Sequence, residues 1–141
     1  MRLLDAADRP SGSLRDRLID KGYDDETVAA VVDRLIEVGL VDDESYAQSA
    51  VRYCVGRLMG YRGAVMELAR KGVDRPLAER VCDEARMSGV FEDAAWELGR
   101  RSAAKTQGMD PKVRKRRFWS SGGRKGHDAE TLRAVAHELF D

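Results

Sequence analysis

Basic side chains crowd the last third of this 141-residue sequence, and their number and spacing suggest a binding chemistry. Ten of them fall within the 26 residues from Arg100 to Lys125. They are Arg100, Arg101, Lys105, Lys112, Arg114, Lys115, Arg116, Arg117, Arg124 and Lys125. Contact with a phosphate backbone requires positive charge at groove spacing, and Phe118 and Trp119 would stack on bases if they were exposed. This segment therefore predicts a basic face that contacts a polyanion.

The formal net charge of zero conceals a gradient along the chain. Residues 1–60 hold 8 Lys and Arg against 12 Asp and Glu, residues 61–98 hold 6 against 8, and residues 99–141 hold 11 against 5. Such an end-to-end dipole suits a molecule that touches a polyanion at one end and a protein elsewhere. Ordinary solvated helix faces remain an alternative explanation.

The other candidate groups for chemistry have structural explanations. The carboxylates from Asp42 to Glu44 lie at an expected helix start, where acidic residues cap free N–H groups. His127 and His137 lack a carboxylate at ligand spacing, and "SSGGRKG" from Ser120 lacks the Ser or Thr that follows Gly-Lys in phosphate-binding loops. No nucleophile and base form a pair. The sequence therefore predicts no enzyme, with no catalytic residue, no metal and no cofactor.

Cysteine usage and hydropathy predict a cytoplasmic protein. Cys54 and Cys82 do not have the spacing of a redox or metal motif, so we expect buried thiols and no disulfide. No apolar run approaches the roughly 18 to 20 residues of a membrane span. The N-terminus "MRLLDAADRP" lacks the apolar core of a signal peptide. We expect a monomer without membrane contact.

A repeated sequence unit positions these residues. "KGYDDETVAAVVDRL" from Lys21, "KGVDRPLAERVCDEA" from Lys71 and "KGHDAETLRAVAHEL" from Lys125 share Lys-Gly-x-Asp, at spacings of 50 and 54 residues. In each copy the lysine complements the dipole at the end of one helix, and the glycine supplies the left-handed residue after it. The aspartate then caps the next helix. The tetrapeptide thus predicts a helix end followed by a helix start.

The first two copies continue in step beyond this turn. "GLVDDESYA" from Gly39 lies fifty residues before "GVFEDAAWE" from Gly89. We expect each glycine to end a helix, the acidic residues after it to begin a third helix, and Leu40 to be an apolar anchor beside the turn. Tyr46 and Trp96 then occupy equivalent positions that face the core.

The pattern predicts an all-α fold of tandem three-helix repeats, with about eight helices and a truncated last repeat. Helices are expected at 12–21, 25–38, 43–59, 62–71, 75–87, 92–106, 111–121 and 128–140. The expected divisions are an N-terminal remnant segment at 1–11, a first repeat at 12–60, a second at 61–108 and a truncated third at 109–141. Units this short cannot bury their apolar stripes alone, so neighbours must stack into an elongated, curved molecule.

The third unit contains a local conflict. Gly122 and Gly123 stand where the earlier copies carry apolar residues, and glycine in a helix interior costs about 1 kcal/mol relative to alanine. We therefore expect the helix to fray from Ser120 to Gly123. Phe118 aligns with Leu14 of the first copy, which favours a place in the core over a base-stacking role.

The units together resemble the RecX family of recombinase regulators, over roughly residues 11–140. "GLVDDESYA" resembles the family's Gly-Leu-(Ile/Val)-Asp-Asp-x-x-(Phe/Tyr)-Ala, and "ELARKGV" from Glu67 resembles its Glu-Leu-x-x-Lys-Gly-(Ile/Val). We expect the positions that carry the resemblance to be structural. They are Gly39, Leu40, Asp42, Asp43, Tyr46, Ala47, Lys71 and Gly72.

The resemblance implies a regulatory protein that binds the RecA recombinase filament on single-stranded DNA. It implies inhibition of ATP hydrolysis and strand exchange, a role in DNA repair, recombination and the SOS response, and weak, sequence-indifferent contact with single-stranded DNA. The family commonly has a further helix before the first unit, whereas ten residues precede Ser11 here. Two alternatives remain open: a helical-repeat adaptor for another protein, and a DNA-binding protein with a helix-turn-helix face or non-specific contacts.

Overall fold

The computed structural model describes residues 9–141, and within this range the chain forms eight α-helices and no strand. The helices are α1 Ser11–Asp20, α2 Asp25–Glu37, α3 Asp43–Gly56, α4 Tyr61–Arg70, α5 Arg75–Met87, α6 Val90–Lys105, α7 Pro111–Arg124 and α8 Ala129–Phe140. The all-α class is confirmed, and every expected helix end lies within three residues of the observed one. The first eight residues of the expected N-terminal segment 1–11 lie outside the described residues.

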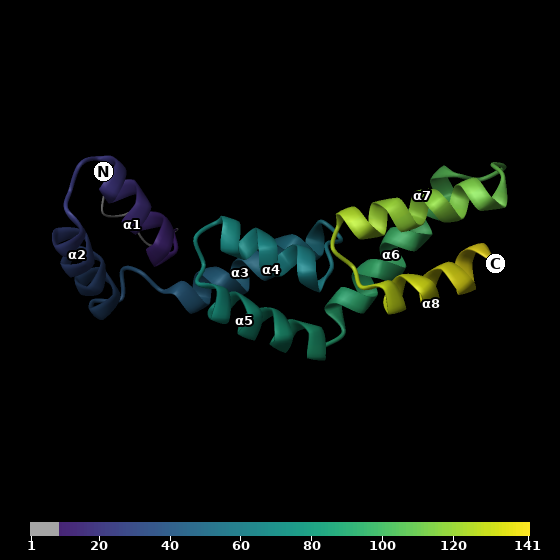
Figure 1. Ribbon diagram of the computed structural model, residues 1–141. Helices are drawn as coiled ribbons and strands as arrows, with labels where there is room; N and C mark the ends of the chain where they lie inside the picture. The colour runs from purple at the N-terminus through teal and green to yellow at the C-terminus, as the bar shows by residue number, and fades with distance from the viewer. Residues whose placement is uncertain (1–8) are drawn as a thin grey trace.

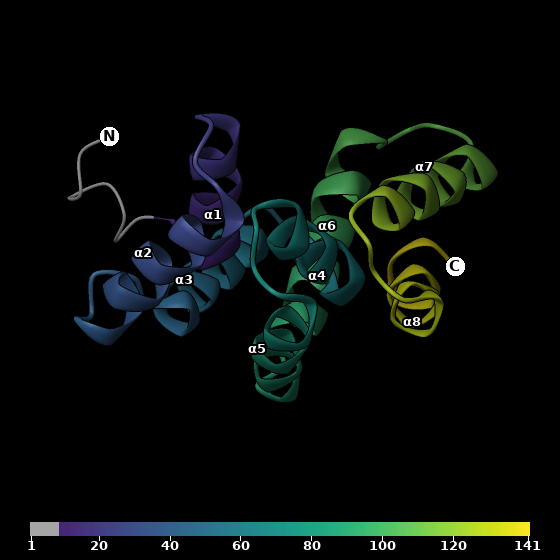
Figure 2. The ribbon, with the colours of Figure 1, turned by 60° about the vertical axis from the view of Figure 1, so that its left-hand side comes forward.

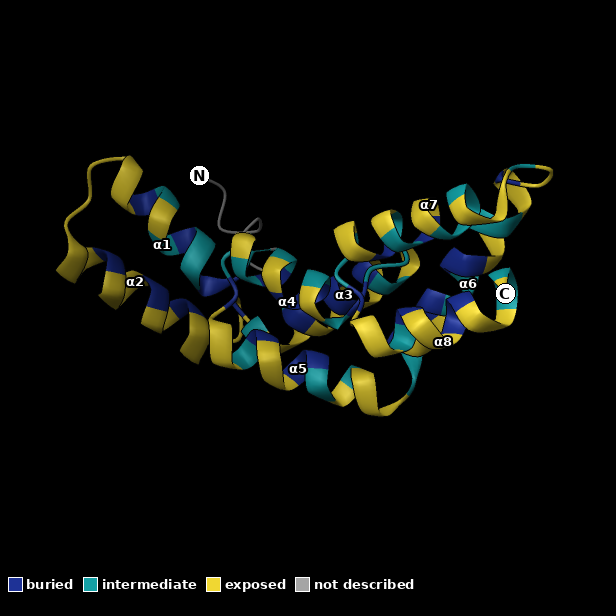
Figure 3. Cartoon of the chain, turned by 45° about the vertical axis from the view of Figure 1, so that its right-hand side comes forward, coloured by how far each residue is buried: buried dark blue, intermediate teal, exposed yellow. Residues whose placement is uncertain are grey.

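The helices form an elongated row of three groups (Figure 1). α1 and α2 lie at one end of the row, and α7 and α8 lie at the other, with α3 to α6 between them. A view from another side shows the same separation of the two ends (Figure 2). Buried residues follow the inner helix faces in each group, while the outer faces are exposed (Figure 3).

Three hydrophobic clusters define these groups. The first group, α1 and α2, packs around residues such as Leu14 and Val32. The second group, α3 to α5, encloses Leu68 and Cys82 together with Phe91 from the start of α6, and the third group, α6 to α8, encloses Phe118. The expected boundaries near residues 60 and 108 therefore separate helices that share a cluster. The sequence repeats and the packed groups therefore have different boundaries. α3 ends the first repeat but packs in the second group, and α6 ends the second repeat but begins the third group.

Left-handed glycines end the helices that precede each Lys-Gly-x-Asp turn. The φ angles of Gly22, Gly72 and Gly126 are +96°, +100° and +83°. Residues with a Cβ rarely adopt this backbone region, so glycine is needed for the turn. The predicted helix ends at these positions are confirmed.

Aspartate caps the next helix in two of the three copies. The Asp24 carboxylate accepts a hydrogen bond from the Thr27 N–H, and Asp128 accepts one from the Thr131 N–H, both at 2.7 Å. These bonds lower the pKa of both carboxyls. The expected cap at Asp74 is wrong, because this side chain makes no capping bond at the start of α5. Its helix begins with a proline in the first turn, which removes one N–H donor.

The glycine pair does not end α7, so the expectation of fraying is wrong. The helix continues through both residues to Arg124. Gly122 is buried, and a Cβ placed on it would lie 2.4 Å from the Leu132 Cδ2 atom of α8. No atom outside its own helix would lie within 4 Å of a Cβ on Gly123. Gly122 therefore lets α8 approach closely, a contact that offsets its low helix propensity.

The aromatic residues assigned to the core lie in it or pack against it. Phe118 is fully buried, as predicted, with its ring centroid 5.4 Å from that of Phe140. Tyr46 and Trp96 are partly buried against the second and third clusters. The anchor role expected of Leu40 is wrong, because this side chain is 38% exposed. Its neighbour Val41 is buried in the first cluster instead.

Both cysteines are buried in the second cluster as free thiols, as predicted. Burial raises the pKa of the Cys54 thiol, and it raises that of Cys82 to about 12. A thiolate is the reactive form of cysteine, so neither side chain is activated for nucleophilic chemistry. Among residues 9–141, no helix is both long enough and apolar enough to traverse a bilayer.

Candidate functional site

A close backbone contact joins the second group to the third. We call this contact the second joint, because a similar contact links the first group to the second. At the start of α4, the Gly60 N–H donates a hydrogen bond to the Lys125 carbonyl at 2.8 Å. A Cβ placed on Gly63 would lie 2.2 Å from the same carbonyl oxygen, and one on Gly126 would lie 2.1 Å from the Gly63 nitrogen. Only residues without a Cβ allow the α7–α8 turn to rest on α4 in this way.

Two side chains of the α7–α8 turn hold the α3–α4 turn at this joint. The Lys125 Nζ donates to the Arg57 carbonyl at 2.7 Å, and the His127 Nε2 lies 2.8 Å from the Leu58 carbonyl oxygen. Because a carbonyl only accepts, the His127 Nε2 carries a proton and donates. Leu58 has a φ of +63°, the one positive φ outside glycine among the described residues. This strained backbone is therefore held in place by bonds to both neighbouring carbonyls.

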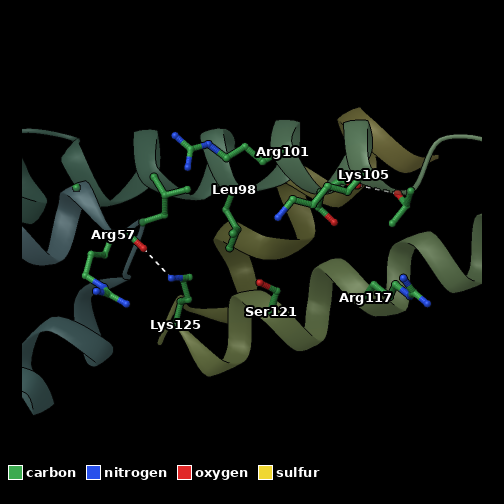
Figure 4. Close-up of a pocket in the computed structure, with 11 residues that line it drawn as sticks. Arg57, Leu98, Arg101, Lys105, Arg117, Ser121 and Lys125 are labelled. Carbon is green, nitrogen blue, oxygen red and sulfur yellow. Dashed lines mark hydrogen bonds between the residues drawn. The ribbon is translucent and has the colours of Figure 1, made fainter.

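A basic groove of about 380 Å³ opens beside this joint, between α6, α7 and the α3–α4 turn (Figure 4). We call it the basic groove. Five of its eleven lining residues are cations, and none is a carboxylate. The cations are Arg57, Arg101, Lys105, Arg117 and Lys125. Leu58, Leu98 and three hydroxyl side chains contribute to the remaining surface. The groove therefore combines five cations with hydroxyl groups and no lining carboxylate, a composition suited to phosphate oxygens.

Four of the ten basic residues expected at the interface line this groove: Arg101, Lys105, Arg117 and Lys125. Arg124 lies in an adjoining groove of about 390 Å³, which shares Arg57 and Lys125 with the first. That second groove also contains the ion pair between Arg70 and Glu67. Lys112 and Arg116 are exposed on α7 but do not line either groove. The predicted basic face is thus divided among several surfaces.

Arg114 and Lys115 serve packing rather than an open face. The Arg114 Nε donates to the Thr106 hydroxyl at 3.1 Å, and its Nη2 donates to the Ala103 carbonyl at 3.0 Å. Its guanidinium also lies 5.4 Å from the centroid of the Phe140 ring. Lys115 forms an ion pair with the Asp141 side chain. These contacts fix α7 against α6 and α8.

Glu97 partly offsets the charge at the start of the basic segment. Its carboxylate pairs with Arg100 and Arg101, each at 3.1 Å. The bonds from Arg101 and Arg100 lower the pKa of the Glu97 carboxyl, which therefore remains ionised. Arg101 lines the groove, but Arg100 does not. The other four cations of the groove, Arg57, Lys105, Arg117 and Lys125, form no ion pair within residues 9–141.

Sequence reasoning missed Arg57. This residue follows α3, 44 positions before Arg101, and no local motif marks it. Its guanidinium donates to the Tyr53 hydroxyl at 3.1 Å and lies 5.7 Å from the centroid of that ring. The only sequence signal that bears on it is the third Lys-Gly-x-Asp copy, whose lysine bonds the Arg57 carbonyl. The hydrogen bond from Lys125 to Arg57 could not be predicted from the spacing of residues in the sequence.

The signature acids Asp42 and Asp43 cap two different helices. Asp42 accepts from the Ser45 N–H at 3.0 Å and caps its own helix, α3. Asp43 instead accepts from the Ser11 N–H at 2.6 Å and from the Ser11 hydroxyl at 2.5 Å. It therefore caps α1 and ties the first group to the second. The structural role expected of both residues agrees with these bonds.

The remaining signature residues support turns and a first joint. A Cβ on Gly12, at the start of α1, would lie 2.4 Å from the Gly72 carbonyl oxygen in the α4–α5 turn. We call this contact the first joint. The Lys71 ammonium lies 4.8 Å from the centroid of the Tyr53 ring. Gly39 has a φ of +78° after α2, and Ala47 is fully buried in α3.

The chain is similar to known RecX sequences. A family model for the first three-helix domain of RecX matches residues 1–35. The chain is 37% identical over 143 residues to the regulatory protein RecX of Thermobifida fusca (strain YX), covering 99% of this chain and 76% of the relative. It is 48% identical over 77 residues to that of Mycobacterium sp. (strain JLS), covering 52% of this chain and 41% of the relative. With the RecX of Chlorobium limicola, it shares 28% identity over 141 residues, covering 99% and 86%.

Two solved structures share the fold. The crystal structure of RecX from Lactobacillus salivarius superposes with a TM-score of 0.80 at 20% identity, covering 93% of this chain and 85% of that one. A crystal structure of another regulatory protein RecX gives a TM-score of 0.77 at 18% identity, covering 92% and 65%. The arrangement of helices around the basic groove therefore belongs to a fold already observed by experiment.

Proposed function

The chain belongs to the RecX family of regulatory proteins, and from this premise we propose that it binds RecA filaments on single-stranded DNA. Binding inhibits ATP hydrolysis and strand exchange by the recombinase, and so modulates DNA repair and recombination. The observation that carries the proposal is the similarity to the Thermobifida fusca regulatory protein, which extends along nearly the whole chain.

The shape and charge of the molecule support this function. Three helical groups in a row present a long surface, which suits contact with several subunits of a filament (Figure 1). The acidic excess lies in residues 1–98, and the basic excess lies in residues 99–141. A filament on DNA offers both protein surface and phosphate, so the two ends of the gradient have different partners. The basic groove is the natural contact for the phosphate.

The proposed mechanism is occupation of a surface rather than catalysis. The buried thiols are protonated, and the candidate acids Asp42 and Asp43 are engaged in helix caps. Inhibition then follows because the bound protein covers surface that filament growth, a homologous duplex or subunit rearrangement requires.

A steady-state ATPase assay tests the proposal. RecA from the same host would be assembled on single-stranded DNA, and the protein would be added up to equimolar amounts. We expect the rate of ATP hydrolysis to fall. We also expect the filaments seen by electron microscopy to become shorter. An unchanged rate together with unchanged filaments would contradict the proposal.

The two alternatives predict different binding. An adaptor for another protein would be captured by that partner and would not co-sediment with RecA filaments. A helix-turn-helix protein would prefer particular duplex sequences, whereas the proposed function predicts sequence-indifferent binding that weakens with salt. Titrations with two unrelated duplexes and with single strands separate these cases.

A further inference from the structure

The first helical group presents apolar side chains that residues 9–141 leave exposed, at the end of the row away from the basic groove (Figure 1). We propose that a face made by Gly22, Tyr23 and Val31 is a docking site for an amphipathic α-helix of a protein partner. The partner helix carries small apolar residues along one side and Lys or Arg beside them. We call this face the open face. Such a contact involves neither the basic groove nor DNA, so it goes beyond the proposed function.

Val31 is exposed where its counterparts in the sequence repeat are buried. It is 38% exposed, whereas Val81 and Val135, at the same position of the second and third copies, are 4% and 0% exposed. In the second group α3 packs on α5, and its Val51 lines the same hollow as Val81. In the third group a Cβ on Gly99 of α6 would lie 2.5 Å from the Val135 Cγ1 atom of α8. A helix therefore covers this valine in both groups, and Val31 has no such cover within residues 9–141.

The turn before α2 is exposed in the same way. Val73 and His127, which follow the turn glycine in the second and third copies, are buried where their turns rest on the preceding group. Tyr23 at the same position is 54% exposed. Beyond its chain neighbours, no atom of the described residues would lie within 4 Å of a Cβ on Gly22. The first group thus leaves exposed both surfaces through which the other two groups contact a further helix.

Exposed apolar side chains are concentrated in the first group. Of the nine large ones that are exposed among residues 9–141, six fall within residues 19–40. They are Ile19, Tyr23, Val31, Ile36, Val38 and Leu40. Val31 and Val38 are seven positions apart, so they lie on the same side of α2. Apolar side chains gathered in this way mark an interaction site, whereas single exposed ones are ordinary.

The charge beside the open face indicates which partner fits it. Residues 20–26 are all exposed and hold four carboxylates against one ammonium group. They are Asp20, Asp24, Asp25 and Glu26, with Lys21 as the cation. Two copies of this chain would bring two acidic turns together, and like charges brought together in an interface cost free energy. A partner helix with Lys or Arg beside its apolar side would instead match both the charge and the apolar surface.

The α6 sequence supplies a probe, because α6 covers the counterpart of Val31 in the third group. The probe is a fluorescein-labelled peptide of residues 90–105 with a hydrocarbon staple between positions 93 and 97. The staple holds the peptide helical and replaces two of its three carboxylates, so that Arg100, Arg101 and Lys105 give it a basic end. Its affinity for the intact protein is measured by fluorescence anisotropy.

Two serine variants test the apolar part of the open face. The open-face variant carries Tyr23→Ser and Val31→Ser. The matched control carries Met66→Ser and Met87→Ser, which change two exposed apolar side chains outside the first group. We expect the open-face variant to bind the peptide about tenfold more weakly than the wild-type protein, and the control to bind within about twofold of it. Thermal melting of each variant checks that it folds.

Two amide variants test the charge. Asp25→Asn with Glu26→Gln neutralises the first turn of α2, and Glu92→Gln with Asp93→Asn neutralises the first turn of α6. Both pairs stand at helix starts, so their effects on helix stability are matched. We expect the α2 pair to weaken peptide binding by about threefold at low salt and the α6 pair to leave it unchanged.

Hydrogen exchange and sedimentation velocity identify the occupant. Bound peptide should protect α2 and the turn before it. No binding to the wild-type protein, equal loss in the open-face variant and its control, or protection confined to other helices would overturn the proposal. So would a dimer that Val31→Ser dissociates, because a second copy would then be the occupant. Binding that appears only after residues 2–8 are removed would also overturn it, because the chain would then cover its own face.

Discussion

The two joints between the helical groups use the same backbone geometry with different side chains around it. At the first joint, Gly12 of α1 meets Gly72 of the α4–α5 turn, and at the second joint, Gly63 of α4 meets Gly126 of the α7–α8 turn. In both, a turn of the Lys-Gly-x-Asp repeat rests against the start of a helix from the preceding group. The glycine of the repeat thus has two functions, the left-handed turn and the close contact.

The residue after that glycine shows how the joints differ. Val73 at the first joint is buried in an apolar cluster, whereas His127 at the second is buried with a hydrogen bond to the Leu58 carbonyl. The preceding lysines differ too, since Lys71 lies over the Tyr53 ring and Lys125 bonds the Arg57 carbonyl. The same backbone contact therefore occurs with different side chains around it, and the basic groove lies beside the second joint.

The largest effect is expected from Gly63→Ala at the second joint. Alanine favours a helix interior by about 1 kcal/mol, but its Cβ would contact the Lys125 carbonyl oxygen, so the groups must separate. We expect a net loss of about 1–3 kcal/mol in the free energy of unfolding, the usual cost of overpacking, measured by urea denaturation. Gly12→Ala should behave alike at the first joint. Equal or greater stability of both variants would show that the contacts are dispensable.

Asp43→Ala tests the hydrogen bonds that join α1 to α3 beside the first joint. The substitution removes the bonds to the Ser11 N–H and hydroxyl, and loss of a helix cap costs about 1–2 kcal/mol. Hydrogen exchange should accelerate in α1 while the third group keeps its protection. If exchange in α7 and α8 rises as much as in α1, the two joints are not independent.

The pH dependence of stability tests what is particular to the second joint. Burial lowers the pKa of His127 below its ordinary 6.5, despite the bond to Leu58 and the nearby Asp128 carboxylate, while Lys125 also opposes its protonation. The folded state therefore favours neutral His127, so its contribution is complete above pH 6.5 and is lost as the pH falls below it. One proton limits the slope of this loss to about 1.4 kcal/mol per pH unit.

His127→Val, which copies the residue of the first joint, supplies the control. Chemical denaturation of both proteins from pH 8 to pH 5 should show a difference in stability that narrows toward the acid end. A constant difference would mean that His127 does not titrate differently in the folded and unfolded states.

The smallest effect is expected from Gly123→Ala in α7, outside both joints. No atom outside its own helix lies within 4 Å of the position of the new Cβ, and the helix continues through this residue. The substitution should raise the free energy of unfolding by about 0.5 kcal/mol, through helix propensity alone. Gly122→Ala, one residue earlier, should lower it, because its Cβ would meet Leu132. Opposite signs for adjacent glycines would confirm that packing, not flexibility, explains the pair.

Much of the fold could be predicted from the sequence because helix ends are local events. The turn glycines and the caps at Asp24 and Asp128 depend on residues a few positions apart, and Phe118 was placed in the core by repeat alignment. The predictions for Asp74 and Leu40 were wrong. Whether a side chain caps a helix or is buried depends on the groups that the tertiary structure places beside it. The same applies to Gly122, whose partner Leu132 lies on another helix.

The candidate site was less predictable. Ten cations in one segment indicated a basic region, but helical geometry sends neighbouring residues to different faces. Arg114 and Lys115 turn toward α6 and the C-terminus, Arg117 turns toward the groove, and Arg57 joins it from 44 residues before Arg101.

By itself, the sequence determined the helices, their period and the basic excess of the C-terminal third, since these follow from spacing, turn chemistry and composition. Only the tertiary structure decided which helices share a core, that α3 and α6 begin their groups, and which cations converge. The physical reason is that the two joints are backbone contacts between residues about 60 positions apart. These contacts form only because the residues on both sides are glycines, which have no Cβ. No periodicity in the sequence shows which glycines come into contact.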